Sequence, residues 1–214
     1  MNPRPRKAKW LARFPSSAVL VRLRSESIYL TFDDGPDPVH TPPLLDLLRK
    51  HGVTATFFVV GKNAERHPEI VQRMVNEGHC LGNHSWNHEA FDTLPVADQL
   101  DEIARTDALL ERFDGKKRHD FRPPCGKLPP SLLFALLRKR IRIAYWSYDS
   151  LDYMKLGADR LCALFSRQPL VGGDVVLMHD DEDDAAAALV NAIPAWQAKG
   201  MTFSALPATA GTRP

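Results

Sequence analysis

The sequence alternates between short segments rich in β-branched and aromatic residues and longer segments with one apolar face. This alternation constrains the fold more than any other feature, because the short segments predict strands and the amphipathic ones predict helices. The predicted strands cover residues 27–32, 55–60, 79–83, 121–122, 142–148, 174–178 and about 201–206. The predicted helices cover residues 41–51, 68–77, 96–113, 131–140, 158–167 and an Ala-rich stretch that ends at Lys199.

Strands that alternate with helices favour a parallel sheet with right-handed crossovers. The number of units is too large for the usual dinucleotide-binding fold, and its Gly-rich phosphate fingerprint is absent from the sequence. The predicted architecture is therefore an α/β fold in the form of a closed or nearly closed (β/α) barrel. A length of 214 residues, 44% of them hydrophobic, agrees with a single domain that buries a sizeable core.

Polar side chains follow most of the predicted strands. In a (β/α) barrel the carboxyl ends of the strands form one rim, and the chemistry of such folds takes place there. A plainer interpretation of "DDGPDP" is that Asp and Gly-Pro simply end a strand, since they are ordinary turn formers. The other strand ends favour a shared site, for which we predict Asp33, Asp34, His84, His88, Arg122, Asp149, Asp152 and His179.

The stretch "HSWNH" places His84 and His88 four residues apart. At that spacing two imidazoles lie one above the other across a helical turn, so both can face one ion. Two histidines four apart also arise by chance. With one carboxylate of the Asp33–Asp34 pair they would make a His, His, carboxylate set that leaves coordination open for water, as in catalytic zinc sites.

The second carboxylate of the pair would then stay free to act as a base. A metal ion lowers the pKa of bound water, and an adjacent carboxylate can accept a proton as water attacks a carbonyl. The departing amine needs an acid, and His179 in "LMHD" is the available one. The residues therefore predict a metal-dependent hydrolase.

The charges are distributed unevenly along the chain. Residues 1–24 carry seven of the 28 Lys and Arg residues and none of the 26 Asp and Glu residues. We predict that they form a basic N-terminal arm, most simply a solvated leader, with peripheral contact to an anionic membrane as the alternative. The slightly acidic remainder makes nucleic acid an unexpected partner.

No uninterrupted apolar run reaches the ~18 residues that a membrane-spanning helix requires. The stretch from Trp10 to Leu23 is broken by charged residues and proline, and no signal-peptide cleavage pattern stands out, which favours a cytoplasmic location. The three cysteines form no C-x-x-C pair, so neither a disulfide framework nor a structural zinc knot is predicted. Cys80 and Cys162 are predicted to be small buried residues.

Five motifs occur in a defined order: "TFDDGP" (31–36), "HSWNH" (84–88), "RPPCG" (122–126), "WSYDSLDY" (146–153) and "LMHD" (177–180). This series resembles the polysaccharide deacetylases of carbohydrate esterase family four. In length and in flanking segments such as "HPEIVQRMVNEGH", the chain is similar to NodB-type chitooligosaccharide deacetylases. The resemblance covers about Ser27 to Leu206 and leaves out only the arm and the last residues.

The resemblance implies a distorted (β/α) barrel in a catalytic domain of residues 25–207, followed by a flexible tail of residues 208–214. It also implies metal-dependent removal of N-acetyl groups from N-acetylglucosamine-containing oligo- or polysaccharides. The implied cofactor is one divalent ion, zinc in the first place, with cobalt or a related ion as the alternative.

The same resemblance implies a role for each motif residue. Asp33 would be the base, held by Arg122, while Asp34, His84 and His88 would bind the metal. His179 would be the acid, kept cationic and oriented by Asp152 or, as the alternative, by Asp149. The substrate would contact the main-chain N–H of Cys125 as an oxyanion donor, Leu177 around the acetyl methyl group, and the side chains of Trp146 and Tyr153.

Two positions depart from the family pattern, which has Tyr or Phe in place of Cys125 and Trp in place of Tyr153. The oxyanion donor survives because it is a main-chain group, but an aromatic wall for sugar stacking is lost. Cys125 has the further alternatives of a soft metal ligand or an oxidation-sensitive thiol. The other hypotheses are a catalytically impaired carbohydrate-binding protein, a deacylase of another N-acyl (for example N-formyl) amino sugar, and a lipid- or nucleic-acid-binding protein that uses the arm.

Overall fold

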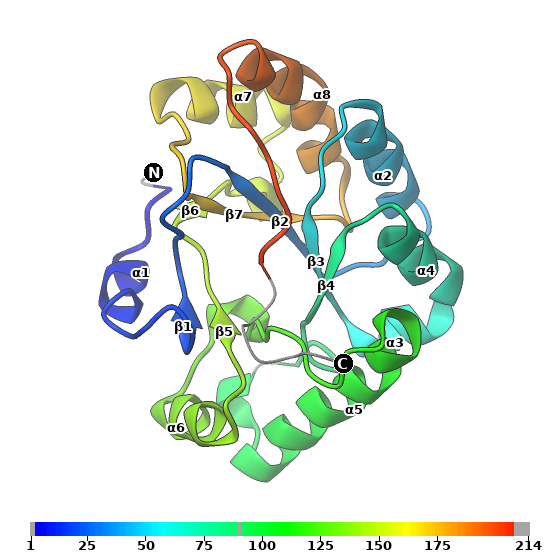
Figure 1. Ribbon diagram of the computed structural model, residues 1–214, viewed down its shortest axis with the longest axis vertical. Helices are drawn as coiled ribbons and strands as arrows, with labels where there is room; N and C mark the ends of the chain where they lie inside the picture. Colours follow the sequence, from blue (N-terminus) through cyan, green and yellow to red (C-terminus); the bar gives the residue numbers. More distant parts are fainter. Residues whose placement is uncertain (1–2, 90, 208–214) are drawn as a thin grey trace.

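The computed structural model describes residues 3–89 and 91–207 and has the predicted α/β fold (Figure 1). Five strands form a parallel sheet in the order β4, β3, β2, β7, β6, and β1 pairs in parallel with β5. The strands are β1 (Val19–Leu20), β2 (Tyr29–Asp33), β3 (Thr56–Val59), β4 (Cys80–Asn83), β5 (Ile143–Ala144), β6 (Tyr148–Asp149) and β7 (Val175–His179).

Helices surround the strands on the outside of the molecule (Figure 1). They are α1 (Arg6–Leu11), α2 (Thr41–Lys50), α3 (Gly61–Arg66), α4 (Pro68–Asn76), α5 (Val96–Asp114), α6 (Pro130–Lys139), α7 (Ala158–Arg167) and α8 (Asp183–Gln197). The six helices predicted from periodicity are confirmed within a few residues at each end. The short helix α3 was not predicted, because only Gly61 and Ala64 in it are buried and it has no apolar face to recognise.

The side-chain alternation of β2 separates two parts of the hydrophobic core. Leu30 and Phe32 join the cluster that packs against the outer helices, whereas Tyr29 belongs to a second cluster inside the barrel. The inward positions two and four residues later are Thr31 and Asp33, and both accept hydrogen bonds from a buried arginine. A strand period of two residues therefore places Asp33 on the interior face at the end of the strand.

Single bridges rather than long strands complete the barrel. Phe121 pairs in parallel with Asn83 on one side and with Ile143 on the other, so it connects β4 to β5. The predicted single strand 142–148 is wrong, because the chain changes partners within it. The N–H of Tyr145, which follows β5, donates to the carbonyl of Leu20 in β1. The N–H of Ser147, which precedes β6, donates instead to the carbonyl of Val175 in β7.

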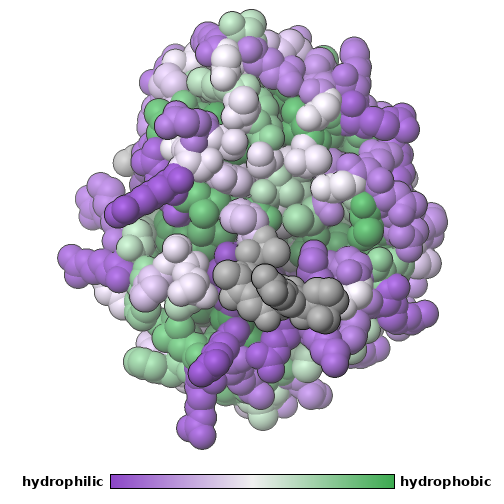
Figure 2. Space-filling model, viewed as in Figure 1, coloured by the Kyte–Doolittle hydropathy of each residue, from purple (hydrophilic) through white to green (hydrophobic). Residues whose placement is uncertain are grey.

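The predicted last strand near residues 201–206 is reduced to one bridge between Phe203 and Ile28. Nevertheless, this segment crosses the amino ends of the strands, where the Leu206 N–H donates to Thr56 Oγ1. Figure 1 shows it crossing the front of the molecule, and Figure 2 shows hydrophobic residues near the centre of this face with hydrophilic ones around its edge. The predicted tail 208–214 lies outside the described residues.

The prediction that the basic arm is a solvated leader is wrong for its described residues. Ala8 and Leu11 of α1 are buried, and β1 is a buried strand of the barrel. Arg4 forms two hydrogen bonds, of 3.0 and 2.9 Å, with the buried carboxylate of Asp174. The arm thus fills the gap between β1 and the β6–β7 edge. None of the described helices has the length and apolar character needed to cross a bilayer.

Candidate functional site

The register of the strands brings the predicted site residues to one end of the barrel. Asp33 at the end of β2 is paired with His179 at the end of β7, and Asp149 of β6 is paired with Leu177 of β7. On the other side, Asn83 ends β4 next to His84. A pocket of ≈ 350 Å³ opens there, lined by Asp33, Asp34, His84, His88, Cys125, Gly126, Trp146, Asp149, Tyr153, Leu177 and His179.

Arg122 lies beneath this pocket, fully buried, and holds Asp33. Its Nη1 donates to Asp33 Oδ1 at 2.7 Å and to Thr31 Oγ1 at 2.8 Å. Nε donates to the carbonyl of Ala144 and Nη2 to that of Tyr145, and the guanidinium lies over the ring of Phe58. Burial lowers the pKa of Arg122, and Asp33 opposes this effect. A buried cation with several hydrogen bonds of this kind fixes the carboxylate that it contacts.

Asp34 points away from Arg122 toward two imidazoles. Its Oδ1 lies 3.3 Å from His84 Nε2 and 3.0 Å from His88 Nε2. Its backbone has a positive φ of 78°, which explains why it does not continue the alternation of the strand. Burial acts to raise the pKa of Asp34, but the two neighbouring histidines outweigh it and hold this pKa well below its usual range.

His84 and His88 lie in a loop, so the predicted helical turn is wrong. Ser85 and His88 both have positive φ, of 67° and 58°. The rings still come together, with centroids 5.0 Å apart. Helix α5 holds the loop, because Glu102 Oε2 accepts the N–H groups of Trp86 and Asn87 at 2.9 and 2.7 Å.

The residues of this cluster fit a divalent cation. Asp34 Oδ1 is buried and accepts no hydrogen bond from the described residues. His84 Nδ1 lies 2.7 Å from the carbonyl oxygen of Arg122, so it carries the proton and leaves the lone pair of Nε2 directed at Asp34. One oxygen and two imidazole nitrogens within 4.8 Å of one another are the donors that zinc-type ions prefer.

His179 faces the pocket from the opposite side and is oriented by Asp152. Its Nδ1–H donates to Asp152 Oδ1 at 2.8 Å, and its backbone N–H donates to Asp152 Oδ2 at 2.7 Å. Burial opposes protonation, but the hydrogen bond and charge of Asp152, together with Asp33 and Asp34, raise the pKa of His179 to about 10. Asp149 makes no hydrogen bond to His179, and burial raises its own pKa to about 6. The hydrogen-bond partner of His179 is therefore Asp152 rather than the alternative, Asp149.

The predicted substrate contacts also line the pocket. Leu177 is inward-facing and buried, Trp146 is buried, and Tyr153 is half exposed at the rim with its ring edge toward His179. Cys125 is exposed, although partial burial of its thiol raises the pKa of Cys125 above its usual value. Cys125 is outside the group whose donor atoms converge, which does not favour a role as metal ligand. Cys80 and Cys162 are half-buried free thiols.

Sequence reasoning missed Asp180, although it follows His179 directly in "LMHD". Its Oδ1 accepts the N–H of Gly35 at 2.9 Å, and its Oδ2 is 2.6 Å from Thr41 Oγ1. A Cβ atom at Gly35 would collide with this carboxylate. Burial raises the pKa of Asp180 to about 7. Asp180 thus holds the turn that follows Asp33 and Asp34, a role that only contacts across the sheet reveal.

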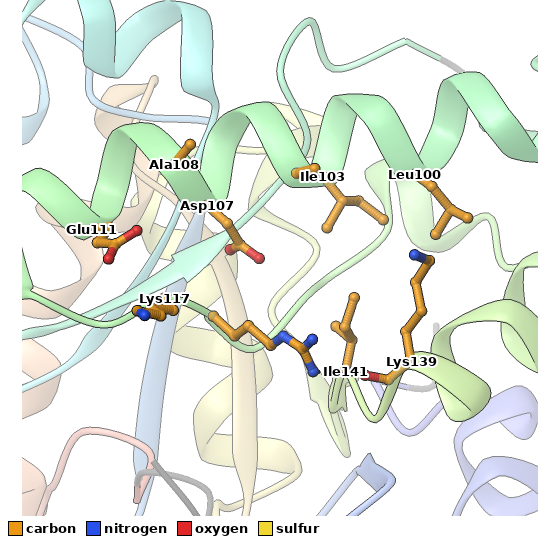
Figure 3. Close-up of a pocket in the computed structure, with 10 residues that line it drawn as sticks. Leu100, Ile103, Asp107, Ala108, Glu111, Lys117, Lys139 and Ile141 are labelled. Atoms are coloured by element: carbon orange, nitrogen blue, oxygen red, sulfur yellow. Dashed lines mark hydrogen bonds between the residues drawn. The ribbon is translucent and has the colours of Figure 1, made fainter. Parts of the chain in front are cut away.

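A second cleft, of ≈ 210 Å³, lies under α5 and shares none of the predicted residues. Figure 3 shows Leu100 and Ile103 pointing from α5 toward Ile141, with Asp107 pointing toward the strands. Asp107 Oδ1 accepts Asn83 Nδ2 at 2.9 Å and contacts His119 Nδ1 at 3.0 Å. The residue after Asn83 is His84, so α5 supports the His84–His88 loop from this side too.

Comparison with known proteins identifies relatives along nearly the whole chain. The family described as polysaccharide deacetylase matches residues 21–143. A peptidoglycan-N-acetylglucosamine deacetylase of Bacillus cereus is 36% identical over 186 residues, a match that covers 84% of this chain and 66% of that protein. A chitooligosaccharide deacetylase of Bradyrhizobium sp. is 33% identical over 201 residues, which cover 86% of this chain and 90% of that protein.

Solved structures agree with the sequence relatives. A peptidoglycan N-acetylglucosamine deacetylase in complex with 4-naphthalen-1-yl-N-oxidanyl-benzamide matches with a TM-score of 0.84 at 32% sequence identity. The match covers 93% of this chain and 94% of that one. The predicted fold class is confirmed.

Proposed function

Since the chain belongs to the polysaccharide deacetylase family, we propose that it is a metal-dependent hydrolase that removes N-acetyl groups from N-acetylglucosamine-containing oligo- or polysaccharides. The predicted enzyme class, a deacetylase, is confirmed by this membership. The observation that carries the proposal is the convergence of Asp34, His84 and His88 in one pocket with a separate carboxylate, Asp33, and a protonated imidazole, His179.

We assign the metal site to Asp34 Oδ1 and the Nε2 atoms of His84 and His88. Zinc is the proposed ion, with cobalt as a substitute, because imidazole and carboxylate donors suit both. When bound, the ion supplies Lewis acidity to the amide carbonyl and to the attacking water.

Asp33 is the proposed base. Its Oδ1 is occupied by Arg122, which leaves Oδ2, 3.7 Å from His84 Nε2, as the oxygen that faces the site. This oxygen accepts the proton of the water as it attacks the acetyl carbonyl carbon. Arg122 thus acts through Asp33 and is a positioning residue.

His179 is the proposed acid. A pKa of about 10 keeps its imidazole protonated at neutral pH, and Nδ1 is committed to Asp152. The proton on Nε2 is therefore available to the sugar nitrogen when the carbon–nitrogen bond breaks. The products are acetate and a free amino sugar.

The main-chain N–H of Cys125 is the proposed donor to the oxyanion. It has no acceptor among the described residues, whereas the next two N–H groups, of Gly126 and Lys127, turn back onto Pro123 and Pro124. Leu177 is placed to contact the acetyl methyl group, and Trp146 and Tyr153 to contact the sugar.

The alternative functions have less support from the described residues. An impaired carbohydrate-binding protein is not favoured, because all the residues proposed as base, acid and metal ligands line one pocket. A lipid partner for the arm and a cytoplasmic location stay predictions. Arg4 and Lys7 of the arm already have partners within the fold, which leaves fewer of its cations for an anionic partner.

The test is acetate and free-amine release from short chitin oligomers by the full chain. We expect turnover that is abolished by a chelator and restored by zinc or cobalt. A parallel panel of N-formyl and other N-acyl amino sugars identifies the acyl group. Sugar binding without any product across the panel, with metal bound, would instead establish the binding-protein alternative.

A further inference from the structure

The basic arm reaches the turn that carries the proposed oxyanion donor. Lys7 of α1 donates from Nζ to the carbonyl oxygen of Gly126 at 2.6 Å, across 119 positions of sequence. Its ammonium group lies 5.5 Å from the centre of the Tyr145 ring. Partial burial, together with the nearby Lys127, lowers the pKa of Lys7. Nothing in the motifs of the family predicts this contact, because Lys7 lies outside them.

The turn from Pro124 to Gly126 has a backbone conformation that needs support. Cys125 and Gly126 both have positive φ, of 52° and 61°. A side-chain-bearing residue in this region costs about 1–2 kcal/mol, and it persists only where its surroundings hold it. The direction of the Cys125 N–H depends on this conformation, so whatever holds the turn also aims the donor.

Aromatic packing holds the turn from one side. A Cβ atom on Gly126 would lie 2.7 Å from Trp146 Cη2, so the backbone there is in close contact with the indole. Trp146 is stacked on Tyr145 with a centroid distance of 3.9 Å and an interplanar angle of 8°. Lys7, lying over Tyr145, is the polar contact that completes this cluster.

The backbone around Lys7 is itself held in place, so Lys7 can support the turn. Arg4 is bound to the buried Asp174 on one side of it, and Leu11 is fully buried on the other. The carbonyl oxygen of Pro3 also accepts the N–H of Asp149, a residue of the pocket, at 2.7 Å. The segment of residues 3–11 is therefore attached to the rim of the site at more than one point.

We propose that Lys7 is a positioning residue for the reaction, which holds the carbonyl of Gly126 so that the N–H of Cys125 points at the oxyanion of the tetrahedral intermediate. This inference rests on the proposed deacetylase function. The N-terminal arm is then part of the catalytic apparatus rather than a leader.

The test compares Lys7→Met, which keeps the aliphatic stem, with Lys7→Arg, which keeps a cationic donor. The matched control is Lys9→Met, because Lys9 is exposed on the same helix and makes no hydrogen bond or ion pair with the described residues. In the full-length, zinc-loaded enzyme, we expect Lys7→Met to lower kcat about tenfold, less than the loss of a whole oxyanion donor. KM should change less than about twofold, because the contact acts on the transition state.

Amide hydrogen exchange is the second readout and needs no turnover. The exchange rates of the Gly126 and Lys127 amides, which close the turn, should rise severalfold in Lys7→Met and stay near wild type in Lys7→Arg and Lys9→Met. Unchanged exchange in Lys7→Met would show that Lys7 does not hold the turn. Faster exchange with unchanged kcat would show that the turn does not position a catalytic donor.

Failure of the proposed function is distinguishable from failure of this inference. If the wild-type chain released no amine from any acyl sugar, the deacetylase proposal and the positioning role of Lys7 in the reaction would fall together. The exchange rates would still decide whether Lys7 supports the turn. If the melting temperature and kcat fell equally in all three variants, α1 would have only a structural role and the positioning role of Lys7 would be contradicted.

Discussion

Asp33 and Asp34 are neighbours in the chain, yet their side chains contact different partners. Asp33 still follows the strand alternation and meets Arg122 in the interior, whereas the positive φ of Asp34 turns its carboxylate toward the histidines. Two identical residue types therefore occupy two chemical environments. Because of this contrast, substitutions of Asp33 and Asp34 can test their two proposed roles separately.

Replacing the two aspartates should separate metal binding from turnover. We expect Asp33→Asn to keep the metal and the hydrogen bond from Arg122 while kcat falls roughly 10²–10⁴-fold, the range for loss of a general base. Asp34→Ala should lose both metal and activity. Metal content by elemental analysis and kcat on chitin oligomers are the measurements. Normal turnover in Asp33→Asn would contradict its assignment as the base.

If His179 is the acid, as proposed, His179 and Asp152 together should set the alkaline limit of activity. The acid must be protonated, so activity is present below the pKa of His179 and is lost as the pH rises through it. Because Asp152 raises this pKa, Asp152→Asn should move the alkaline limb of kcat to lower pH, by roughly 1–3 units. Asp149→Asn is the comparison and should move the limb less, since Asp149 has no hydrogen bond to His179. Equal shifts would mean that the two carboxylates share the role.

At the scale of elements, α5 supports the site without contributing a residue to the pocket. Glu102 holds the backbone of the His84–His88 loop, and Asp107 holds Asn83 at the end of β4. Asp107 is in turn bound to His119, which also contacts Asp114 at 3.1 Å. The helix and the following loop therefore form one polar network behind the proposed metal ligands.

His119 should make the free energy of unfolding depend on pH. Burial acts to lower its pKa, but Asp107 and Asp114 raise the pKa of His119 to about 9. A folded pKa above the unfolded value of about 6.5 gives stabilisation that is complete below pH 6.5 and is lost as the pH rises through 9. His119→Gln should therefore cost on the order of 3 kcal/mol at pH 6, and less at pH 9.5.

Urea denaturation between pH 6 and pH 9.5 measures this difference. His51→Gln is a matched control, because the side chain of His51 makes no hydrogen bond or ion pair with the described residues. A pH-independent difference between wild type and His119→Gln would contradict a charged, ion-paired histidine.

At the scale of the whole molecule, the chain closes its own barrel with its N-terminal segment. The β1–β5 pair would leave an open edge toward β7, and the arm fills it through Arg4 and a single antiparallel bridge from Arg22 to Asp174. Asp174 is completely buried and also accepts Ser147 Oγ. Removing the arm would leave a buried carboxylate without its cation.

Arg4→Ala should therefore destabilise the fold, by roughly 1–3 kcal/mol, between the values for surface and fully buried ion pairs. Arg6→Ala removes the same charge from an exposed position of α1 that has no ion pair within the described part of the chain, and should change the free energy of unfolding by less than about 0.5 kcal/mol. Urea denaturation at neutral pH compares the two. Equal losses would mean that the net charge of the arm, rather than the Arg4–Asp174 pair, matters.

The sequence by itself determined the alternation of strands and helices, the barrel and the residue types at its rim. It could do so because side-chain periodicity and turn chemistry are local properties, and because the strand ends of a parallel barrel share one edge. The tertiary structure alone decided what depends on contacts between distant segments. Because of such contacts, the predicted strand around Tyr145 pairs with two different strands, and the His84–His88 loop is held by Glu102. They also make Asp152, rather than Asp149, the hydrogen-bond partner of His179.

The basic arm is the clearest case of this division. Its charges suggested a solvated segment, since nothing in the local pattern of residues 1–24 encodes the buried Asp174 or the carbonyl of Gly126 that two of its cations meet. Those partners lie more than a hundred residues away, and only folding brings them together.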